Sequence, residues 1–226
     1  GKEPQKSHFN SKDKMLGVSW YQSATFFTGN RLTVGFDYQH FGGESWNKVL
    51  ATGEHTPGVD KQMDEFAGYV DFRQDISSWF SLDAGIRVDH HSHVGTEWIP
   101  QGGLAFHLPK NAELKAMVSK GYRNPTIREM YMFPPANPEL KPEKLINYEL
   151  SYSQRLLEGV LSYGISLYYI NGDNLIMSNG LFPPLNINSG EIENWGVETN
   201  IGYHINSHWN VNANYSWLHM ENPVLA

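Results

Sequence analysis

Apolar side chains recur at every second position through most of this chain, and this period of two constrains its fold more than any other feature. A β-strand places alternate side chains on opposite faces, so the pattern indicates strands with two different faces. The clearest run alternates apolar with polar or small residues: Phe80, Leu82, Ala84, Ile86 and Val88 against Ser81, Asp83, Gly85, Arg87 and Asp89. About ten such runs of roughly ten residues each predict an all-β, antiparallel, up-and-down meander.

The connections between these runs alternate between short and long. We predict tight turns near residues 28, 76, 110, 157 and 207, and long outer loops near 42–64, 122–145 and 178–188, with a short link near Val94 as one exception. A run of about ten residues matches the length that a tilted strand needs to cross a bilayer. Short turns on one side and longer loops on the other are typical of an outer-membrane barrel. The pattern therefore predicts part of a transmembrane β-barrel.

One face of the predicted sheet is too polar to be buried under a second layer. It carries Asp37, Asp71, Asp83, Arg87, Asp89, Glu149 and Glu198. The opposite face is aliphatic, and aromatic residues gather near its turn-side ends, namely Trp79, Phe80, Tyr152, Tyr203 and Trp209. Aromatic belts at strand ends are typical of a barrel in lipid. The alternative is a soluble antiparallel sheet with one solvated face, but strand length, loop asymmetry and ring placement all favour the membrane barrel.

The composition excludes several classes of protein. The net charge of −7 and the pI near 5.8 argue against binding to nucleic acid. There is no cysteine, so a disulfide or a thiolate metal site is impossible. No window approaches the roughly 18 apolar residues of a membrane helix, which excludes a helical membrane protein but not a barrel. Because no P-loop, dinucleotide-binding, HExxH or nucleophile motif is present, we expect no enzyme activity and no cofactor.

The N-terminal region lacks the alternation of apolar and polar residues that marks the rest of the chain. Residues 1–14 are polar and charged, and we expect them to lie outside a barrel that occupies residues 15–226. No signal peptide is visible between Gly1 and Met15, so we expect either a processed chain or a piece of a longer one.

A long excursion between Lys120 and Tyr152 organises the chain. Its prolines, at positions 125, 134, 135, 138 and 142, hold the backbone extended without ladder hydrogen bonds. Its candidate ligand-binding or loop-root residues are Arg123, Asn124, Arg128, Glu129 and Tyr131. On one interpretation the arginines attract anionic ligands to the mouth of a chamber. On the other, which we favour, Arg128 and Glu129 pair with neighbouring parts of the protein and the loop is a structural hinge.

A histidine cluster, formed by His90, His91 and His93, is the one group in the sequence that resembles a metal site. Histidine is the commonest metal ligand, and alternation would place His91 and His93 on the same face of a strand. However, the chain has ten histidines, so a chance cluster at a strand end is the simpler interpretation and a metal or haem site the less favoured one.

Four motifs in the second half of the chain together resemble one family. The segment Gly121-Tyr-Arg-Asn-Pro-Thr-Ile-Arg-Glu129 is similar to the G-[FY]-R-x-P-[ST]-[ILF]-x-E motif of TonB-dependent outer-membrane receptors. Asn137-Pro-Glu-Leu-Lys-Pro-Glu143 and Tyr148-Glu149 resemble the segments that follow it in that family. Asn188-Ser-Gly190 with Trp195-Gly-Val-Glu198 resembles the family's N-x-G-x-x-x-x-x-G-x-E strand. The resemblance covers most of the chain from about residue 15 onward.

The resemblance implies a receptor in the cell outer membrane that admits a scarce ligand with energy relayed by TonB. It implies a ferric siderophore or related iron chelate as the first ligand class, with haem, cobalamin or a glycan as the others. It also implies lipid, an internal plug domain and further barrel strands as partners, with TonB reached through an N-terminal region. A passive porin or an adhesion-type barrel without a plug is the alternative function.

The chain departs from the family pattern in three respects. The plug, the TonB-contacting box and the usual C-terminal aromatic strand are not found in the sequence. We therefore expect a fragment, the C-terminal part of the barrel. A partial wall has unpaired strand edges, so we expect the fragment either to pair its edges with a second copy or to form an open, strongly bent sheet.

Overall fold

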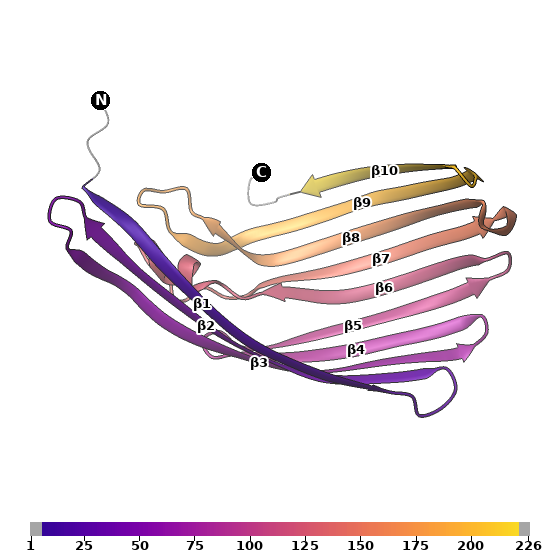
Figure 1. Ribbon diagram of the computed structural model, residues 1–226, viewed down its shortest axis with the longest axis horizontal. Helices are drawn as coiled ribbons and strands as arrows, with labels where there is room; N and C mark the ends of the chain where they lie inside the picture. The colour runs from indigo at the N-terminus through magenta and orange to yellow at the C-terminus, as the bar shows by residue number, and fades with distance from the viewer. Residues whose placement is uncertain (1–5, 222–226) are drawn as a thin grey trace.

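The computed structural model describes residues 6–221, which form one curved antiparallel sheet (Figure 1). Its ten strands lie side by side in sequence order. They are β1 (Ser7–Ala24), β2 (Asn30–Val49), β3 (His55–Ser77), β4 (Phe80–His91), β5 (Gly95–Leu108), β6 (Ala112–Arg123), β7 (Glu143–Leu156), β8 (Leu161–Ser178), β9 (Asn186–Asn206) and β10 (Trp209–Glu221). Two short helical segments, η1 (Arg128–Met132) and η2 (Leu157–Gly159), interrupt this pattern. The prediction of an all-β meander of about ten strands is confirmed.

Tight turns join the strands at one end of the sheet, on the right of Figure 1, and we call this the turn end. Lys110 and Asn111 connect β5 to β6 with φ angles of 61° and 54°. Two consecutive positive φ angles are typical of the two-residue hairpin turns whose twist matches that of the flanking strands. At the opposite end, the loop end, the longest connection between described strands joins β6 to β7.

The strand register assembles one continuous aliphatic row across six strands. Directly paired residues, from β4 to β9, are Leu82, Leu104, Ala116, Leu150, Leu167 and Val197. No second layer of residues 6–221 covers this row, and the side chains of Leu150 and Leu167 remain 46% and 45% exposed. An exposed aliphatic row of this length is typical of the lipid-facing surface of a membrane barrel, and we call this side of the sheet the apolar face.

The opposite face, which we call the polar face, carries a network of charges. Arg87 of β4 donates hydrogen bonds to Asp37 of β2 and, at 3.1 Å, to Asp89. Further toward the turn end, the Gln101 amide of β5 donates to Asp71 of β3 over 2.9 Å. The predicted division into a polar and an aliphatic face is thus present in the structure.

Aromatic side chains mark two levels on the apolar face. At the turn end, the ring centroids of Trp79 and Phe80 lie 5.7 Å apart, and the ring of Phe106 lies 5.1 Å from that of Phe80. Toward the loop end, Trp217 of β10 stacks edge-on against Trp195 at 4.8 Å. Eight residues separate Trp209 from Trp217, which is about 26 Å along a strand and roughly 20 Å after tilting. That separation is close to the height of the lipid-facing band of an outer-membrane barrel.

Two predicted boundaries are wrong at the loop end of the first strands. The polar segment 1–14 is predicted to lie outside the sheet, but β1 begins at Ser7 and pairs with β2 as far as Val49; the part of this prediction that concerns residues 1–5 lies outside the described residues. Much of the predicted long loop 42–64 is likewise strand, because β2 runs to Val49 and β3 starts at His55. Pro57 lies opposite Trp46, beside a β-bulge between Glu44 and Trp46, and a proline at a bulge is compatible with strand pairing.

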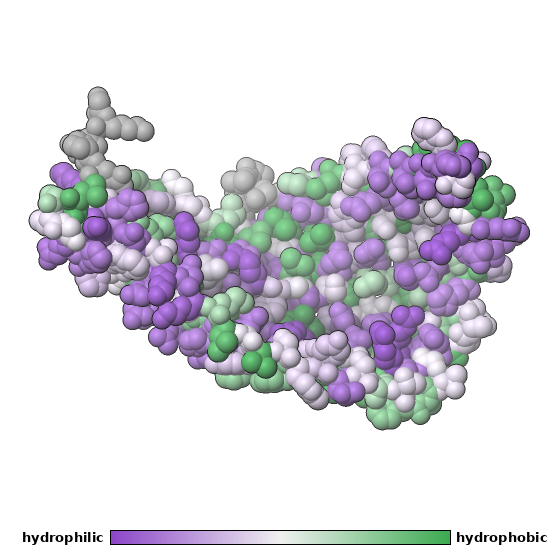
Figure 2. Space-filling model, in the orientation of Figure 1, coloured by the Kyte–Doolittle hydropathy of each residue, from purple (hydrophilic) through white to green (hydrophobic). Residues whose placement is uncertain are grey.

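This extension explains why the alternation is lost there. Figure 2 shows hydrophilic residues gathered over the loop ends of β1 to β3, on the left of the view. Strand residues that have water on both faces have no reason to alternate, so the pattern of two faces stops where the lipid stops. In contrast, the predicted loop near 178–188 agrees with the unpaired residues 179–185 between β8 and β9.

The edges of the sheet are open within residues 6–221. β1 pairs only with β2, and β10 pairs only with β9. The sheet is strongly bent (Figure 1), as expected for part of a barrel wall. No helix among these residues has both the length and the apolar character needed to cross a membrane. Association of two copies through the edges stays a prediction.

Replacing Leu167 with arginine tests the assignment of the faces. We expect Leu167→Arg to lower the free energy of unfolding of the protein in lipid vesicles by about 2–4 kcal/mol, because it places a charge on the lipid-facing row. Ser166→Arg is the matched control, since Ser166 lies on the polar face opposite Glu198 of β9. Urea titration of both variants gives the two free energies, and equal losses would contradict the assignment.

Candidate functional site

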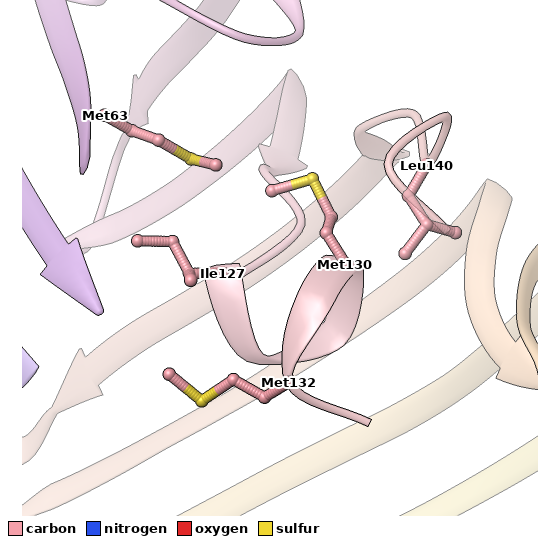
Figure 3. Close-up of a cluster of buried hydrophobic side chains, with 5 residues drawn as sticks. All are labelled: Met63, Ile127, Met130, Met132 and Leu140. Atoms are coloured by element: carbon pink, nitrogen blue, oxygen red, sulfur yellow. The ribbon is translucent and has the colours of Figure 1, made fainter. Parts of the chain in front are cut away.

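The loop between β6 and β7, residues 124–142, packs against the polar face of β2 and β3, where its side chains meet Gly43 and Met63. Its short helix η1 places Met130 at the centre of a small apolar cluster in which Met130 is 0% exposed. Figure 3 shows Ile127, Met132 and Leu140 around it, with Met63 of β3 reaching in from the sheet. The loop therefore has its own core, which fixes it to the wall.

A glycine on β2 makes room for this cluster. A Cβ atom on Gly43 would lie 2.8 Å from Cγ2 of Ile127 and 3.1 Å from Cε of Met132. Real Cβ atoms essentially never come as close to another atom as 2.8 Å, so a larger residue at position 43 would force Ile127 or the backbone of the loop to shift. Gly43 is thus a packing position beneath the loop.

Arg123, the last residue of β6, ties the two ends of the loop together. Its Nη1 and Nη2 donate to the two carboxylate oxygens of Glu129 at 2.9 and 3.0 Å, and its Nε donates to Glu143 at 2.6 Å. The other oxygen of Glu143 accepts the backbone N–H of Ile176 in β8 over 2.8 Å. A bidentate guanidinium–carboxylate pair is among the stronger polar contacts in proteins, so Arg123 closes the root of the loop.

Glu129 also caps the start of η1. Its carboxylate accepts hydrogen bonds from the backbone N–H of Thr126 at 2.8 Å and from the Thr126 hydroxyl at 2.9 Å. The Thr126 hydroxyl in turn accepts the N–H of Glu129 at 3.2 Å. This reciprocal arrangement is a capping box. Partial burial disfavours the charged carboxylate, but the hydrogen bonds from Arg123 and Thr126 outweigh it and lower the pKa of Glu129 below its ordinary value.

Three asparagines fasten the far half of the loop to β9. The side chain of Asn137 donates to the carbonyl of Asn186 at 2.7 Å. Asn186 donates to the carbonyl of Glu129 at 3.0 Å, and the Asn188 side chain both accepts from and donates to the backbone of Lys141, at 2.8 and 2.9 Å. These hydrogen bonds satisfy backbone N–H and C=O groups that have no partner strand, because the proline-rich loop does not pair with the sheet. Two of the recognised motifs, around Asn137 and Asn188, therefore contact each other.

A second polar cluster lies beyond the point where the pairing of β6 with β5 ends. The ladder between β5 and β6 ends at Gln101 and Ser119, and beyond it Lys120 and Lys144 both reach Glu97, at 3.0 and 2.6 Å. The Asn124 side chain donates to Glu65 of β3 over 2.9 Å. The end of β6 thus leans across the short β4–β5 hairpin and contacts β3.

A cavity of about 670 Å³ separates this strand end and loop from the wall. Its lining combines apolar and polar side chains: Met15, Phe41, Met63 and Ile127, with Glu65, Arg87, His91, Tyr122, Asn124 and Arg128 among the polar ones. A mixed concave lining of this kind is typical of binding sites.

The structure brings the five loop candidates into different surroundings. Arg123 and Glu129 form the ion pair at the loop root, and Asn124 contacts Glu65. Arg128 instead lies over the ring of Phe133, with Cζ 5.0 Å from the ring centroid. Tyr131 lies beneath the Lys61 ammonium, 5.0 Å from its ring centroid, and its hydroxyl is 3.4 Å from His93. The contacts of Arg123 and Glu129 support the hinge interpretation for those two residues.

The structure does not bring the three histidines together. His90 hydrogen bonds to Thr96 at 2.9 Å, beside Phe66 on the apolar face, whereas His91 faces the loop and stacks on Phe41. His93 hydrogen bonds to the carbonyl of Pro138 at 2.7 Å. Across residues 6–221 no group of three or more His, Asp or Glu residues has the geometry to hold a metal ion. His93 serves here as another contact between the wall and the loop.

Sequence reasoning missed the apolar half of the site. The methionines at 130 and 132 alternate within a short polar–proline segment that has no strand period, so nothing marked them as core residues. The capping box did have a readable signal, because Thr126 stands three residues before Glu129. The role of Asn186 depends on a contact with residue 137, and no local pattern reveals it.

Comparison with known proteins identifies the family. The sequence model described as "TonB dependent receptor-like, beta-barrel" matches residues 3–224. The chain belongs to this family of TonB-dependent receptor barrels. The resemblance of its motifs to these receptors is confirmed.

Two curated relatives are similar over most of this chain. The chain is 27% identical over 170 residues to the vitamin B12 transporter BtuB of Photobacterium profundum, which covers 72% of this chain and 27% of that protein. It is 26% identical over 186 residues to the iron-regulated outer membrane virulence protein of Vibrio cholerae, covering 70% of this chain and 28% of that protein. The chain therefore spans under a third of the length of these relatives, and it is part of the wall of an outer-membrane β-barrel.

A solved structure shows the same fold. The siderophore receptor PirA from Pseudomonas aeruginosa superposes with a TM-score of 0.75 at 16% sequence identity, covering 93% of this chain and 41% of that chain. The ten strands described above correspond to part of that barrel.

Lowering the pH should release the loop. Because the pKa of Glu129 is lower in the folded loop than in an open one, its ionised form stabilises the folded loop above the ordinary glutamate pKa of about 4.3. That contribution disappears as the pH falls through the lowered value. We expect limited proteolysis within residues 124–142 to be slow at neutral pH and faster in acid, and we expect Glu129→Gln to be cleaved faster already at neutral pH. A Glu129→Gln variant with unchanged cleavage would contradict this role.

Truncating Met130 should detach the loop without unfolding the wall. Removing a fully buried methionine side chain costs about 2–5 kcal/mol, and here that cost falls on the contact between the loop and the sheet. In Met130→Ala we expect hydrogen exchange to quicken in residues 124–142 and to stay slow in β7 and β8. Met117→Ala, at a half-exposed position of β6, is the matched control and should leave loop exchange unchanged.

Proposed function

We propose that this chain forms part of the wall of a receptor that takes up a scarce ligand from outside the cell with energy relayed by TonB. A ferric siderophore or a related iron chelate is the ligand class we favour. The observation that carries the proposal is the loop of residues 124–142, which is held over the polar face by its own core and by Arg123. A loop that is fixed over the polar face would obstruct free diffusion through the barrel, so it favours a receptor with controlled passage over an open porin.

The family supports the energised mechanism. A TonB-dependent receptor needs an internal plug and a complete wall, and the open edges of β1 and β10 are the surfaces to which further strands would pair. The mixed cavity beneath the loop and the charged groups around Arg87 would then face the plug or the ligand passage. We expect TonB to act on the plug and not on this part of the wall.

The names of the relatives support two ligand classes. One curated relative is a vitamin B12 transporter and another is iron-regulated, while a solved structure of the same fold is a siderophore receptor. We favour the iron chelate because Arg128, which lines the cavity and forms no ion pair with any of residues 6–221, suits an anionic ligand. A passive porin or adhesion-type barrel is the alternative function.

Uptake by cells that express the full receptor tests this proposal. We expect accumulation of an iron-labelled ferric siderophore in cells with TonB and its loss in cells without TonB, because transport needs the relayed energy. Labelled cyanocobalamin, measured in parallel, separates the two ligand classes. Equal uptake with and without TonB would indicate a passive porin and would contradict the proposal.

A further inference from the structure

Two carboxyl groups lie next to each other on the polar face, beneath the end of β6. In the register of β3 and β4, Asp89 lies opposite Ala67, which stands two residues along β3 from Glu65. Glu65 and Asp89 are therefore diagonal neighbours on one face of the sheet, and their carboxyl groups are within hydrogen-bonding reach of each other. We call them the carboxyl pair. Two carboxyl groups at this separation favour binding one proton over carrying two negative charges.

One buried oxygen of the carboxyl pair has no hydrogen-bond donor. The side chain of Asp89 is 1% exposed, and its Oδ2 accepts hydrogen bonds from Arg87 at 3.1 and 3.3 Å. Within residues 6–221 no group donates to the other oxygen, Oδ1, and an unsatisfied carboxylate oxygen destabilises a buried site. The hydroxyl of Tyr122 is near, but it has one proton and donates it to Oε1 of Glu65 over 3.4 Å. A proton on Glu65 would satisfy Oδ1.

The charge balance around the carboxyl pair also favours a bound proton. Among residues 6–221, Arg87 is the only cation that hydrogen bonds to the pair, and it donates to Asp37 as well. The ring of His91 is neutral, because its Nδ1 accepts the backbone N–H groups of the residues at 93 and 94, at 3.2 and 3.4 Å, and so carries no proton. Three ionised carboxyl groups beside one guanidinium would leave excess negative charge, which one proton reduces.

The other charged groups nearby are balanced by their own partners or lie in solvent. Glu97 of β5 lies opposite Asp89, and the ammonium groups of Lys120 and Lys144 contact its carboxylate at 3.0 and 2.6 Å. Three charged residues along the adjoining cavity are exposed, so that solvent screens their charges: Asp13, Lys14 and Arg128. These groups therefore leave the excess negative charge of the carboxyl pair in place.

We propose that Glu65 and Asp89 share one proton and thereby form a pH-sensitive latch between β6 and the wall. The Glu65 carboxyl donates this proton to Oδ1 of Asp89, while its Oε2 accepts the amide of Asn124 at 2.9 Å. The latch thus reaches from β4 through β3 to the first residue of the loop. When the proton leaves to solvent, two adjacent negative charges remain, and their repulsion moves Glu65 and Asn124 away from β4. The inference involves neither a ligand nor TonB, so it is independent of the proposed function.

The latch closes at lower pH and opens as the pH rises. In the open state Glu65 is in water and has the ordinary glutamate pKa of about 4.3. Between that value and the pH at which the closed pair loses its proton, only the closed state binds the proton. The opening equilibrium therefore increases about tenfold for each pH unit in this window. The sign is opposite to that of Glu129, whose ion pair with Arg123 releases the loop in acid.

Infrared spectroscopy of the protein in lipid vesicles tests the shared proton directly. At neutral pH we expect a carboxylic-acid C=O band that is lost in both Glu65→Gln and Asp89→Asn, because the one carboxyl group left beside Arg87 is then ionised. Asp71→Asn is the matched control, since it neutralises another carboxylate of the polar face, and it should keep the band. Tyr122→Phe should keep it too. A band that survives in Glu65→Gln, or no band in the unmodified protein, overturns the shared proton.

Hydrogen exchange in residues 120–124 tests whether the proton acts as a latch. Exchange is measured from about pH 5 to about pH 8 and corrected for the intrinsic pH dependence of amide exchange. In the unmodified protein we expect opening to increase at least about tenfold in total across this range. In Glu65→Gln we expect it to stay constant, because the amide donates to Asp89 as the protonated acid does and cannot ionise. Equal pH dependence in the two proteins, or exchange that slows as the pH rises, overturns the latch.

Discussion

Backbone pairing in lipid is the constraint on which the rest of this structure depends. A strand in the bilayer has no water to bond its N–H and C=O groups, so every strand must be paired along its length. Ten strands in strict sequence order, each antiparallel to the last, meet that requirement for all but the outer edges of β1 and β10. Once the register of the strands is fixed, each side chain can point to only one face of the sheet. The aliphatic row from Leu82 to Val197 is a consequence of this register.

The polar face then has a different task, because it must hold an element that does not belong to the ladder. The loop of residues 124–142 achieves this with three kinds of contact: the buried Met130 cluster, the ion pairs of Arg123, and the amide bonds from Asn186 and Asn188. Each contact joins segments far apart in the sequence. The loop is consequently a fixed part of the wall, and residues such as Arg128 are presented from it in a defined position.

The sequence predicted the parts of this fold that are periodic and local. The faces, the tight turns and the strand count were readable because lipid on one side forces alternation, as in the run from Phe80 to Asp89. The strand pairing of residues 7–14 and 42–49 was not readable, because apolar and polar residues do not alternate regularly in these two segments. Within the site, Arg123 and Glu129 were found through their motif, whereas Met130 and Asn186 depend on contacts over long separations that no local pattern encodes.

The central claim is that one face of this wall meets lipid and the other meets an aqueous interior. Single cysteines along β8, each carrying a spin label, test it most directly, because this chain has no cysteine of its own. In the full receptor in lipid vesicles, labels at Ile165, Leu167 and Tyr169 should collide mainly with oxygen dissolved in lipid. Labels at Gly164, Ser166 and Tyr168 should collide mainly with a water-soluble nickel chelate. Accessibility that fails to alternate along β8 would contradict the account.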